Sequence, residues 1–414
     1  MRVNNPANLL SRVISTAACA FLLCAALAAQ TSTVLHQFRA TNSRDGSESY
    51  AGLIAGPHGR LYGDSFLGGS ANNGIIFELS PPASSGGAWV YRVLYSFGAT
   101  PDGAGPRGTL TRDHDGNLYG TTQIGGQSGC GTVFELSPPA ISGGAWTESV
   151  LYSFKCSSTD GSGPLGGVVF DELGNLYGST EGGGVQGLGT VFKLTPSTSG
   201  GTWTEAQLHS FRGDAHDGDE PFYGLTFAGH GTFYGFTSYG GASGSGTFYQ
   251  ITTRGKETVL YTFQDGLDGG APTGEPILDA SGNVYGTANV GGATNNGVVF
   301  EFTLPVVTGQ PWTETVLYSF SGSDGSSPSG VTFGPSGVLY GTTWVGGTNN
   351  DGVVFELAPP TSGGSWTEST LLELDGKGDG ASVWAAPALF NGTLYGVAIG
   401  GGTEGAGTVF AVTP

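Results

Sequence analysis

Seven Asp-Gly pairs recur along the chain and supply seven carboxylates that could act together. If one face of the protein gathered them, their oxygens could bind Ca²⁺, a hard cation that prefers oxygen ligands. Alternatively, each Asp accepts hydrogen bonds from the backbone N–H groups of its own loop, as in an Asx turn. Equal use of all seven favours this second interpretation. The residues concerned are Asp45, Asp102, Asp160, Asp217, Asp268, Asp324 and Asp379.

A second set of candidates stands five residues after each of these aspartates, where the residue type differs from copy to copy. Two aromatic residues together with Arg107 and Glu275 could receive a sugar or a peptide. The alternative is that these side chains only fill a central channel. The candidate ligand-binding residues are Tyr50, Arg107, Phe222 and Trp384 from this set, together with Glu275, which stands close by in the fifth copy; the corresponding positions in the other copies hold Leu165, Thr273 and Ser329.

The sequence contains no recognisable catalytic set. The six histidines are scattered, and no HExxH, G-x-S-x-G or Cys–His pairing occurs. His36 and His209 replace the Tyr of a recurrent LYSF segment, which indicates a structural role. The sequence thus favours a protein that is not an enzyme, although a propeller can also build a site from single residues on several blades. Ca²⁺ is the one cofactor that the residues suggest.

The elements that must position these residues form a sevenfold repeat. The pattern Y-G-x4-G-G-x4-G-x2-[FY] occurs seven times without an insertion, and each copy has an Asp-Gly pair 16 or 17 residues upstream. In one copy the pattern reads LYGTTQIGGQSGCGTVF, residues 118–134. The glycines fall where one strand ends and the next begins, positions that often need a positive φ or a close backbone approach. The motif tyrosines are Tyr62, Tyr119, Tyr177, Tyr234, Tyr285, Tyr340 and Tyr395.

Each copy predicts four short strands with alternating apolar residues. In the second copy these are residues 107–112, 117–122, 131–136 and 145–154. Seven four-stranded units favour an all-β, seven-bladed β-propeller with antiparallel strands in each blade. A β-solenoid is the alternative, although its repeats are usually shorter.

The two ends of the repeat region predict how the ring closes. Residues 31–38 form an extra strand of the fourth type, whereas the chain stops at 414 after a strand of the third type. We expect 31–38 to pair with 407–413 as the outer strand of blade seven. A single propeller then spans 31–414, with repeats that start near 34, 93, 150, 207, 259, 316 and 370.

Two cysteines lie within the repeats at equal distances from the centre of a predicted hairpin. Cys130 precedes the third strand of the second copy and Cys156 follows its fourth strand. Antiparallel pairing would place these residues opposite one another. We therefore predict a Cys130–Cys156 disulfide, a bond typical of exported proteins.

Composition and the N-terminus limit the class of protein. A net charge of −19 argues against binding to nucleic acid, which requires a basic surface. Residues 1–30 have two arginines, an apolar segment at 13–27 and a small-x-small site at 26–28, which predicts a signal peptide. We expect export to the periplasm, the cell surface or the medium, and a monomer without a transmembrane segment in the mature chain.

The repeat resembles the GloVer (Gloeo/Verruco) tandem repeat of exported bacterial proteins. LYSF stands at 94–97, 151–154 and 317–320, NLYGTT stands at 117–122, and the resemblance covers 31–414. It implies export but no particular activity. Two classes of function remain: a non-catalytic binding propeller for carbohydrate or a cell-surface component, and a metal-dependent lyase or hydrolase with its site at the channel mouth, the latter by analogy of fold alone.

Overall fold

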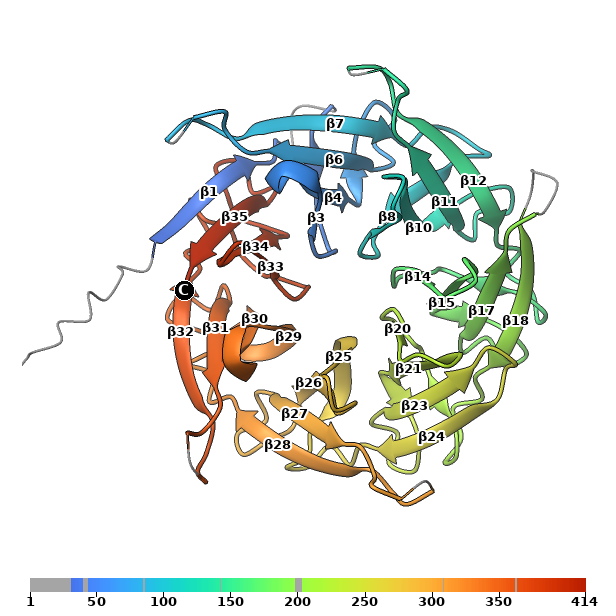
Figure 1. The fold of residues 1–414 in the computed structure, drawn as a ribbon, viewed down its shortest axis with the longest axis vertical. Helices are drawn as coiled ribbons and strands as arrows, with labels where there is room; N and C mark the ends of the chain where they lie inside the picture. The colour runs from blue at the N-terminus through green and yellow to red at the C-terminus, as the bar shows by residue number, and fades with distance from the viewer. Residues whose placement is uncertain are drawn as a thin grey trace, which may run out of the picture.

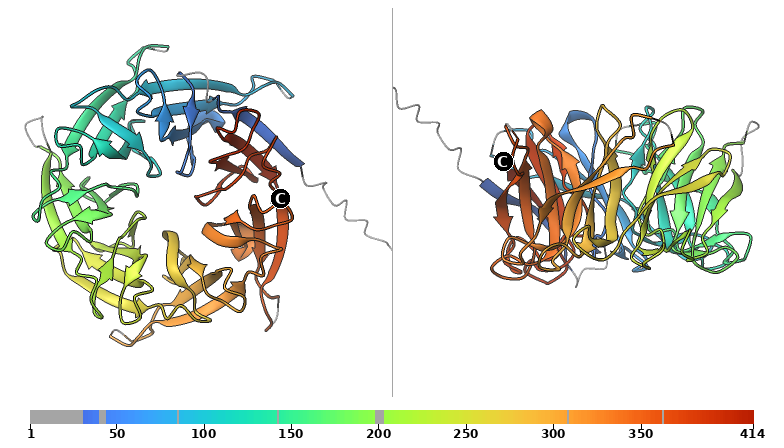
Figure 2. Two further views of the ribbon diagram at one scale, coloured as in Figure 1. Left: turned by 180° about the vertical axis from the view of Figure 1, so that it is seen from behind. Right: turned by 90° about the horizontal axis from the view of Figure 1, so that it is seen from below.

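The computed structural model describes residues 31–39, 44–84, 86–141, 143–197, 203–307, 309–361 and 363–414. Its sheets surround a central axis as a ring of seven blades, so the predicted seven-bladed β-propeller is confirmed (Figure 1). Seen edge-on, the ring is a flat disc (Figure 2). The proposed signal peptide, residues 1–30, lies outside the described residues.

Each blade is an antiparallel sheet whose strands follow one another from the axis outward. In blade 1 these are β3 (Ile54–Ala55), β4 (Leu61–Ser65), β6 (Ile75–Ser80) and β7 (Val90–Ser96). Blade 2 contains β8 (Gly103–Pro106), β9 (Thr111–Arg112), β10 (Leu118–Gly125), β11 (Thr132–Ser137) and β12 (Thr147–Ser153). Blade 3 contains β14 (Val169–Phe170), β15 (Leu176–Thr180), β17 (Thr190–Thr195) and β18 (Thr204–Ser210).

Blades 4 to 6 repeat this order. Blade 4 contains β20 (Thr226–Phe227), β21 (Thr232–Thr237), β23 (Thr247–Thr252) and β24 (Glu257–Thr262). Blade 5 contains β25 (Gly270–Leu278), β26 (Val284–Val290), β27 (Val298–Thr303) and β28 (Thr313–Ser319). Blade 6 contains β29 (Ser326–Phe333), β30 (Leu339–Val345), β31 (Val353–Ala358) and β32 (Thr367–Glu373).

Blade 7 joins the two ends of the described chain. It contains β33 (Ala388–Phe390), β34 (Thr393–Ala398), β35 (Thr408–Thr413) and, as its outer strand, β1 (Thr31–Gln37). Strands β1 and β35 pair antiparallel, with Thr31 opposite Thr413 and Gln37 opposite Thr408. The predicted closure is therefore confirmed, and Figure 1 shows blue β1 beside red β35.

The core is divided among the interfaces between neighbouring blades. The cluster between blades 1 and 2 combines Tyr62, Phe97, Leu118 and Phe134, all of them buried. Corresponding clusters join the other pairs of blades, including blades 7 and 1. Burial of large aromatic side chains between facing sheets accounts for their recurrence at fixed positions.

The glycines of the motif serve packing and turns, as predicted. In blade 2 the Gly120 Cα faces Phe134 across the sheet, and an added Cβ would lie 2.6 Å from the Phe134 ring. Gly125 and Gly126 both have positive φ, 84° and 72°, where the chain turns beside the Asp-Gly segment. Any larger residue would be strained there. The conserved loop length therefore follows from the backbone path.

Cys130 and Cys156 form a disulfide, which confirms the predicted pairing. Their Cα atoms lie 5.7 Å apart, a normal separation for this bond. In the described ranges, no helix is long and apolar enough to cross a membrane.

Candidate ligand-binding site at the channel mouth

A cavity of about 480 Å³ occupies the mouth of the central channel. It is lined by residues that begin the inner strands or immediately precede them, and these come from blades all around the ring. The predicted Tyr50, Arg107, Phe222, Glu275 and Trp384 all line it, together with Leu165 and Ser329. The fold thus gathers side chains that are hundreds of residues apart in sequence.

A smaller cavity of about 150 Å³ adjoins the first one. The two share Phe222, Tyr223, Ser329 and Trp384. Thr273 lines only the smaller cavity, and its hydroxyl is bonded to Thr287 Oγ1 at 2.8 Å. The two cavities therefore lie side by side at the channel mouth.

Aromatic rings form a connected cluster beside the two cavities. The ring centroids of Trp384 and Trp344 lie 5.0 Å apart, those of Trp384 and Tyr50 6.2 Å, and those of Tyr50 and Phe66 5.8 Å. Trp344 remains 40 % exposed, although Trp side chains are on average highly buried. Across the smaller cavity, Phe222 contacts Tyr239, which is 48 % exposed.

Arg107 is fixed against this aromatic cluster. Its guanidinium carbon lies 4.2 Å from the Tyr50 ring centroid and 5.9 Å from that of Trp384. Such cation–π contacts restrict the side chain and leave its N–H donors free to bind a partner in the ring plane. One of these donors bonds Gln123 Oε1 at 3.4 Å.

Acidic groups occupy other parts of the lining. Gln123 Nε2 donates to Glu181 Oε1 at 3.1 Å, so a polar row leads from Arg107 to Glu181. Glu275 is partly buried inside the cavity, and burial raises the pKa of its carboxyl to about 7. No hydrogen bond or ion pair of this carboxyl is found within the described residues. Glu275 is therefore available to a ligand as both a donor and an acceptor near neutral pH.

The space for Glu275 is provided by a glycine. A Cβ added to Gly224 would collide with the Glu275 carboxyl. The backbone of blade 4 thus approaches the side chain from blade 5 more closely than any other residue would allow.

Sequence reasoning missed four lining residues. Each stands four residues after a motif tyrosine, within the x4 segment of the repeat. The available signal was that the residue type at this position varies from copy to copy, as it does five residues after each Asp-Gly aspartate. In the seven copies this position holds Phe66, Gln123, Glu181, Ser238, Asn289, Trp344 and Ile399, of which Glu181, Ser238, Asn289 and Trp344 line a cavity.

The Asp-Gly carboxylates do not lie where the metal hypothesis required. None of the seven lines either cavity. Instead each bonds its own loop, as in Asp102, whose carboxylate accepts Gly98 N, Gly103 N and the Tyr95 hydroxyl at 2.6, 2.7 and 2.9 Å. Tyr95 lies on the outer strand, so Asp102 is held there and not at the channel mouth. The Asx interpretation describes this arrangement.

The same pattern recurs around the ring. Asp160, Asp268 and Asp324 each accept a Tyr hydroxyl from the preceding outer strand. Asp45 and Asp217 bond His36 and His209 in place of Tyr, and Asp379 accepts the backbone N–H of Asp375. Seven carboxylates dispersed in this way cannot coordinate one Ca²⁺ ion together.

Comparisons with known proteins agree with this fold. Residues 22–228 and 200–410 match a family model described as the Gloeobacter/Verrucomicrobia repeat. No curated protein matches the chain in sequence.

Among solved structures, an ulvan lyase of a polysaccharide lyase family is similar, with a TM-score of 0.53, 12 % identity, and coverage of 92 % of this chain and 95 % of that chain. An ulvan lyase bound to -[GlcA(1-4)Rha3S]- gives a TM-score of 0.50 and 13 % identity, covering 88 % and 94 %. A structure proposed to be a gluconolactonase gives 0.41 and 12 %, covering 93 % and 92 %. At these identities the likeness concerns the fold alone.

Proposed function

The chain belongs to the Gloeobacter/Verrucomicrobia repeat family, and we propose that it is an exported, non-catalytic protein that binds an oligosaccharide at the channel mouth. The observation that carries this proposal is the partly exposed aromatic cluster around Trp384, with Arg107 held against it. A sugar ring presents an apolar C–H face and a rim of hydroxyls. Aromatic faces beside a few fixed polar groups suit both features.

The polar groups suggest how such a ligand would be oriented. Arg107 and Gln123 supply donors on one side, whereas Glu181 and Glu275 supply acceptors elsewhere in the cavity. Two adjoining cavities that share Trp384 would accommodate more than one sugar unit. The fold is compatible with this ligand class, since a propeller of similar structure is bound to -[GlcA(1-4)Rha3S]-.

A location outside the cytoplasm is supported by two features. Residues 1–30 have the composition of a signal peptide, and disulfides such as Cys130–Cys156 persist in oxidising compartments. Attachment to a cell-surface polysaccharide would then need no membrane anchor.

The test is a glycan screen on the untagged exported protein, followed by titration calorimetry with the best oligosaccharide. Trp384→Ala should lower the affinity at least about thirtyfold, the loss typical of a central aromatic contact. Glu275→Ala should also weaken binding. Trp366→Ala, which alters a tryptophan packed between blades 5 and 6, serves as the control of the same residue type. Unchanged affinity in both cavity variants would refute the proposed site.

A second candidate function is cleavage of the bound glycan, and Glu275 is the observation that favours it. A carboxyl with a pKa near 7 inside a cavity is suited to general acid–base catalysis. Incubation with the glycan that binds, followed by chromatography of the products, separates the two functions. Products that are formed by the wild type and abolished by Glu275→Gln, with binding retained, would establish catalysis.

A further inference from the structure

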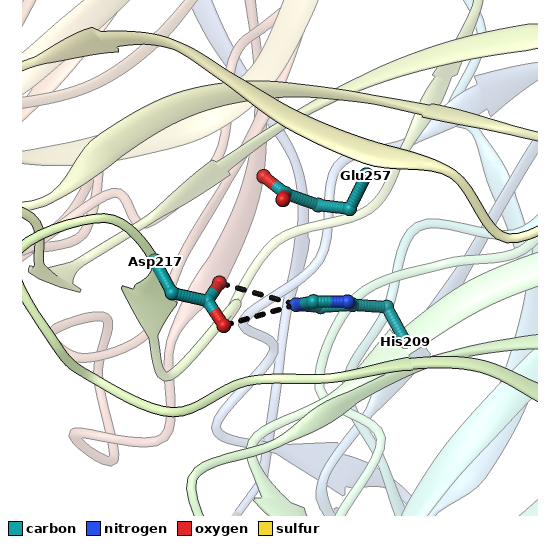
Figure 3. Close-up of side chains that lie close together, drawn as sticks. All are labelled: His209, Asp217 and Glu257. Atoms are coloured by element: carbon teal, nitrogen blue, oxygen red, sulfur yellow. Dashed lines mark hydrogen bonds and ion pairs between the residues drawn. The ribbon is translucent and has the colours of Figure 1, made fainter.

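Three potential metal ligands meet at the interface between blades 3 and 4, away from the channel mouth (Figure 3). His209 lies on β18, Asp217 belongs to the following Asp-Gly pair, and Glu257 begins β24. His209 Nε2 is 3.1 and 3.2 Å from the two carboxylate oxygens of Asp217. One donor atom from each residue lies within 4.8 Å of the others, and the described residues contain no second group of this kind.

The other blade interfaces show why this combination is distinctive. In four of them a Tyr takes the place of His209 and donates its hydroxyl to the Asp: Tyr95, Tyr152, Tyr261 and Tyr318. A neutral imidazole offers a nitrogen lone pair to a metal, whereas a phenol hydroxyl that donates to a carboxylate does not. Only His36 repeats the imidazole in the equivalent position, bonded to Asp45 at 3.1 Å.

The interface that contains His36 lacks the third ligand. Tyr91 occupies the position of Glu257 there and stacks on the His36 ring, with centroids 3.8 Å apart. Histidine, aspartate and glutamate therefore coincide at one interface among the described residues. At this interface the residues of the outer strands differ from those of the other copies, and the difference supplies three potential metal ligands.

The Glu257 carboxyl provides an independent observation. Its Oε1 is buried without a hydrogen-bond partner within the described residues, and Figure 3 shows the carboxyl across a gap from the His209–Asp217 pair. Glu148, Glu205 and Glu314 have the same unpaired oxygen, but no imidazole accompanies them. A bound cation would satisfy the Glu257 oxygen, which is costly to leave without a partner.

We propose that His209, Asp217 and Glu257 bind one Zn²⁺ ion that joins blade 3 to blade 4. Zn²⁺ combines imidazole nitrogen with carboxylate oxygens at about 2.0–2.2 Å, so the ligand atoms of a tetrahedral site lie about 3.3–3.6 Å apart. The three donor atoms lie within 4.8 Å of one another, so the Glu257 carboxyl must move toward the pair by up to about 1.5 Å. Ca²⁺ fits poorly, because it takes six to eight oxygen ligands.

One neighbouring cation must be displaced. Arg212 Nε lies 3.4 Å from Asp217 Oδ2, but this side chain is 55 % exposed and also pairs with Asp214. It can turn toward Asp214 and solvent when Zn²⁺ binds. Asp217 also accepts Gly218 N and Arg212 N, and its oxygens retain further lone pairs for a metal. The His209 side chain is 16 % exposed, which gives the ion a path from solvent.

The test is calorimetric titration of the untagged, chelator-treated protein with Zn²⁺, together with thermal melting. We expect one Zn²⁺ per chain and a melting temperature that rises with Zn²⁺ concentration, because the ion binds only the folded state. His209→Tyr recreates the Tyr–Asp–Glu arrangement of other interfaces and should fold, yet it should lose affinity by at least about tenfold. Glu257→Gln should weaken binding similarly, whereas His36→Tyr should have no effect.

A gain-of-function variant completes the design. Tyr91→Glu places the missing carboxylate beside His36 and Asp45, so the stoichiometry should rise from one to two. A stoichiometry that stays at one in folded Tyr91→Glu would contradict the assignment. Absence of Zn²⁺ binding by the wild type, or binding unaffected by both His209→Tyr and Glu257→Gln, would overturn the proposal.

Discussion

Glu275 owes its position in the cavity to the absence of a side chain at Gly224. Gly224→Ala should push the Glu275 carboxyl aside and weaken oligosaccharide binding by about tenfold, the value of a lost hydrogen bond to a charged group. The melting temperature should change little, because the end of a flexible side chain can move. Calorimetry of Gly224→Ala measures this effect.

The control for this substitution is Gly378→Ala, where an added Cβ meets no atom within 4 Å. If Gly224→Ala binds as tightly as Gly378→Ala, Glu275 takes no part in recognition. A common loss of affinity in both variants would instead indicate a general effect of the substitution.

The cavity residues five positions after each Asp-Gly aspartate could be predicted, because their residue type varies between copies whose other motif positions stay the same. Tyr50, Arg107 and Trp384 were found this way, and they line the cavity. Trp344 and Glu181 were not predicted, because the Gly-Gly pair that follows each of them indicated only a turn. The predicted location of the Asp-Gly carboxylates at the channel mouth was wrong. A usable signal was the Tyr that precedes four of these aspartates, such as Tyr95 before Asp102.

At the scale of the element, the outer strands carry glutamates whose protonation is linked to folding. Burial, with a further effect of Asp102, raises the pKa of Glu148 from 4.5 to about 7. The folded protein thus binds this proton more tightly than the unfolded chain. The resulting stabilisation is fully present below about pH 4.5 and is lost as the pH rises through about 7.

Glu148→Gln should therefore change the unfolding free energy in a pH-dependent way. The variant should gain stability relative to wild type between pH 5 and pH 8, because its amide cannot ionise. Guanidinium denaturation at both pH values measures the difference. Glu172→Gln, which changes an exposed glutamate, is the control. A difference that is independent of pH would show that Glu148 does not ionise in this range.

The alternation of apolar residues predicted the strands, but it did not predict a β-bulge that recurs in every blade. In all seven blades a β-bulge interrupts the pairing of the third and fourth strands, as between Val133 and Phe134. Here Tyr152 faces Val133 and Val150 faces Phe134, which leaves Leu151 without a partner. Bulges depend on how the strand bends against its neighbour, and sequence alternation alone does not specify this.

At the scale of the whole molecule, closure depends on β1. Phe38 follows that strand and is fully buried between blades 7 and 1. The centroids of the Phe38 and Phe77 rings lie 5.6 Å apart. Phe38→Ala should cost about 3–5 kcal/mol of stability. The loss should also loosen β1 and increase hydrogen exchange along β35, which would become an unpaired sheet edge.

Phe320→Ala provides the matched control, since Phe320 holds the equivalent place between blades 5 and 6. Its stability loss should be similar, but β35 should stay as protected as the other third strands. Equal exchange along β35 in the two variants would show that the ring is not closed chiefly by β1.

Closure was predictable because the chain has a spare strand at one end and lacks one at the other. The cavity volume and the Zn²⁺ ligand geometry were not, since both depend on how blades pack face to face. His209 and Glu257 are 48 residues apart (257 − 209) and meet only because adjacent outer strands face one another.

The most direct test of the account is a crystal structure of the protein with the best-binding oligosaccharide. The account predicts a sugar ring against Trp384 or Tyr50 in the cavity of about 480 Å³, with Arg107 or Glu275 in hydrogen-bonding distance. A glycan bound to the outer strands or to the opposite face of the disc, with the cavity occupied by solvent, would contradict it.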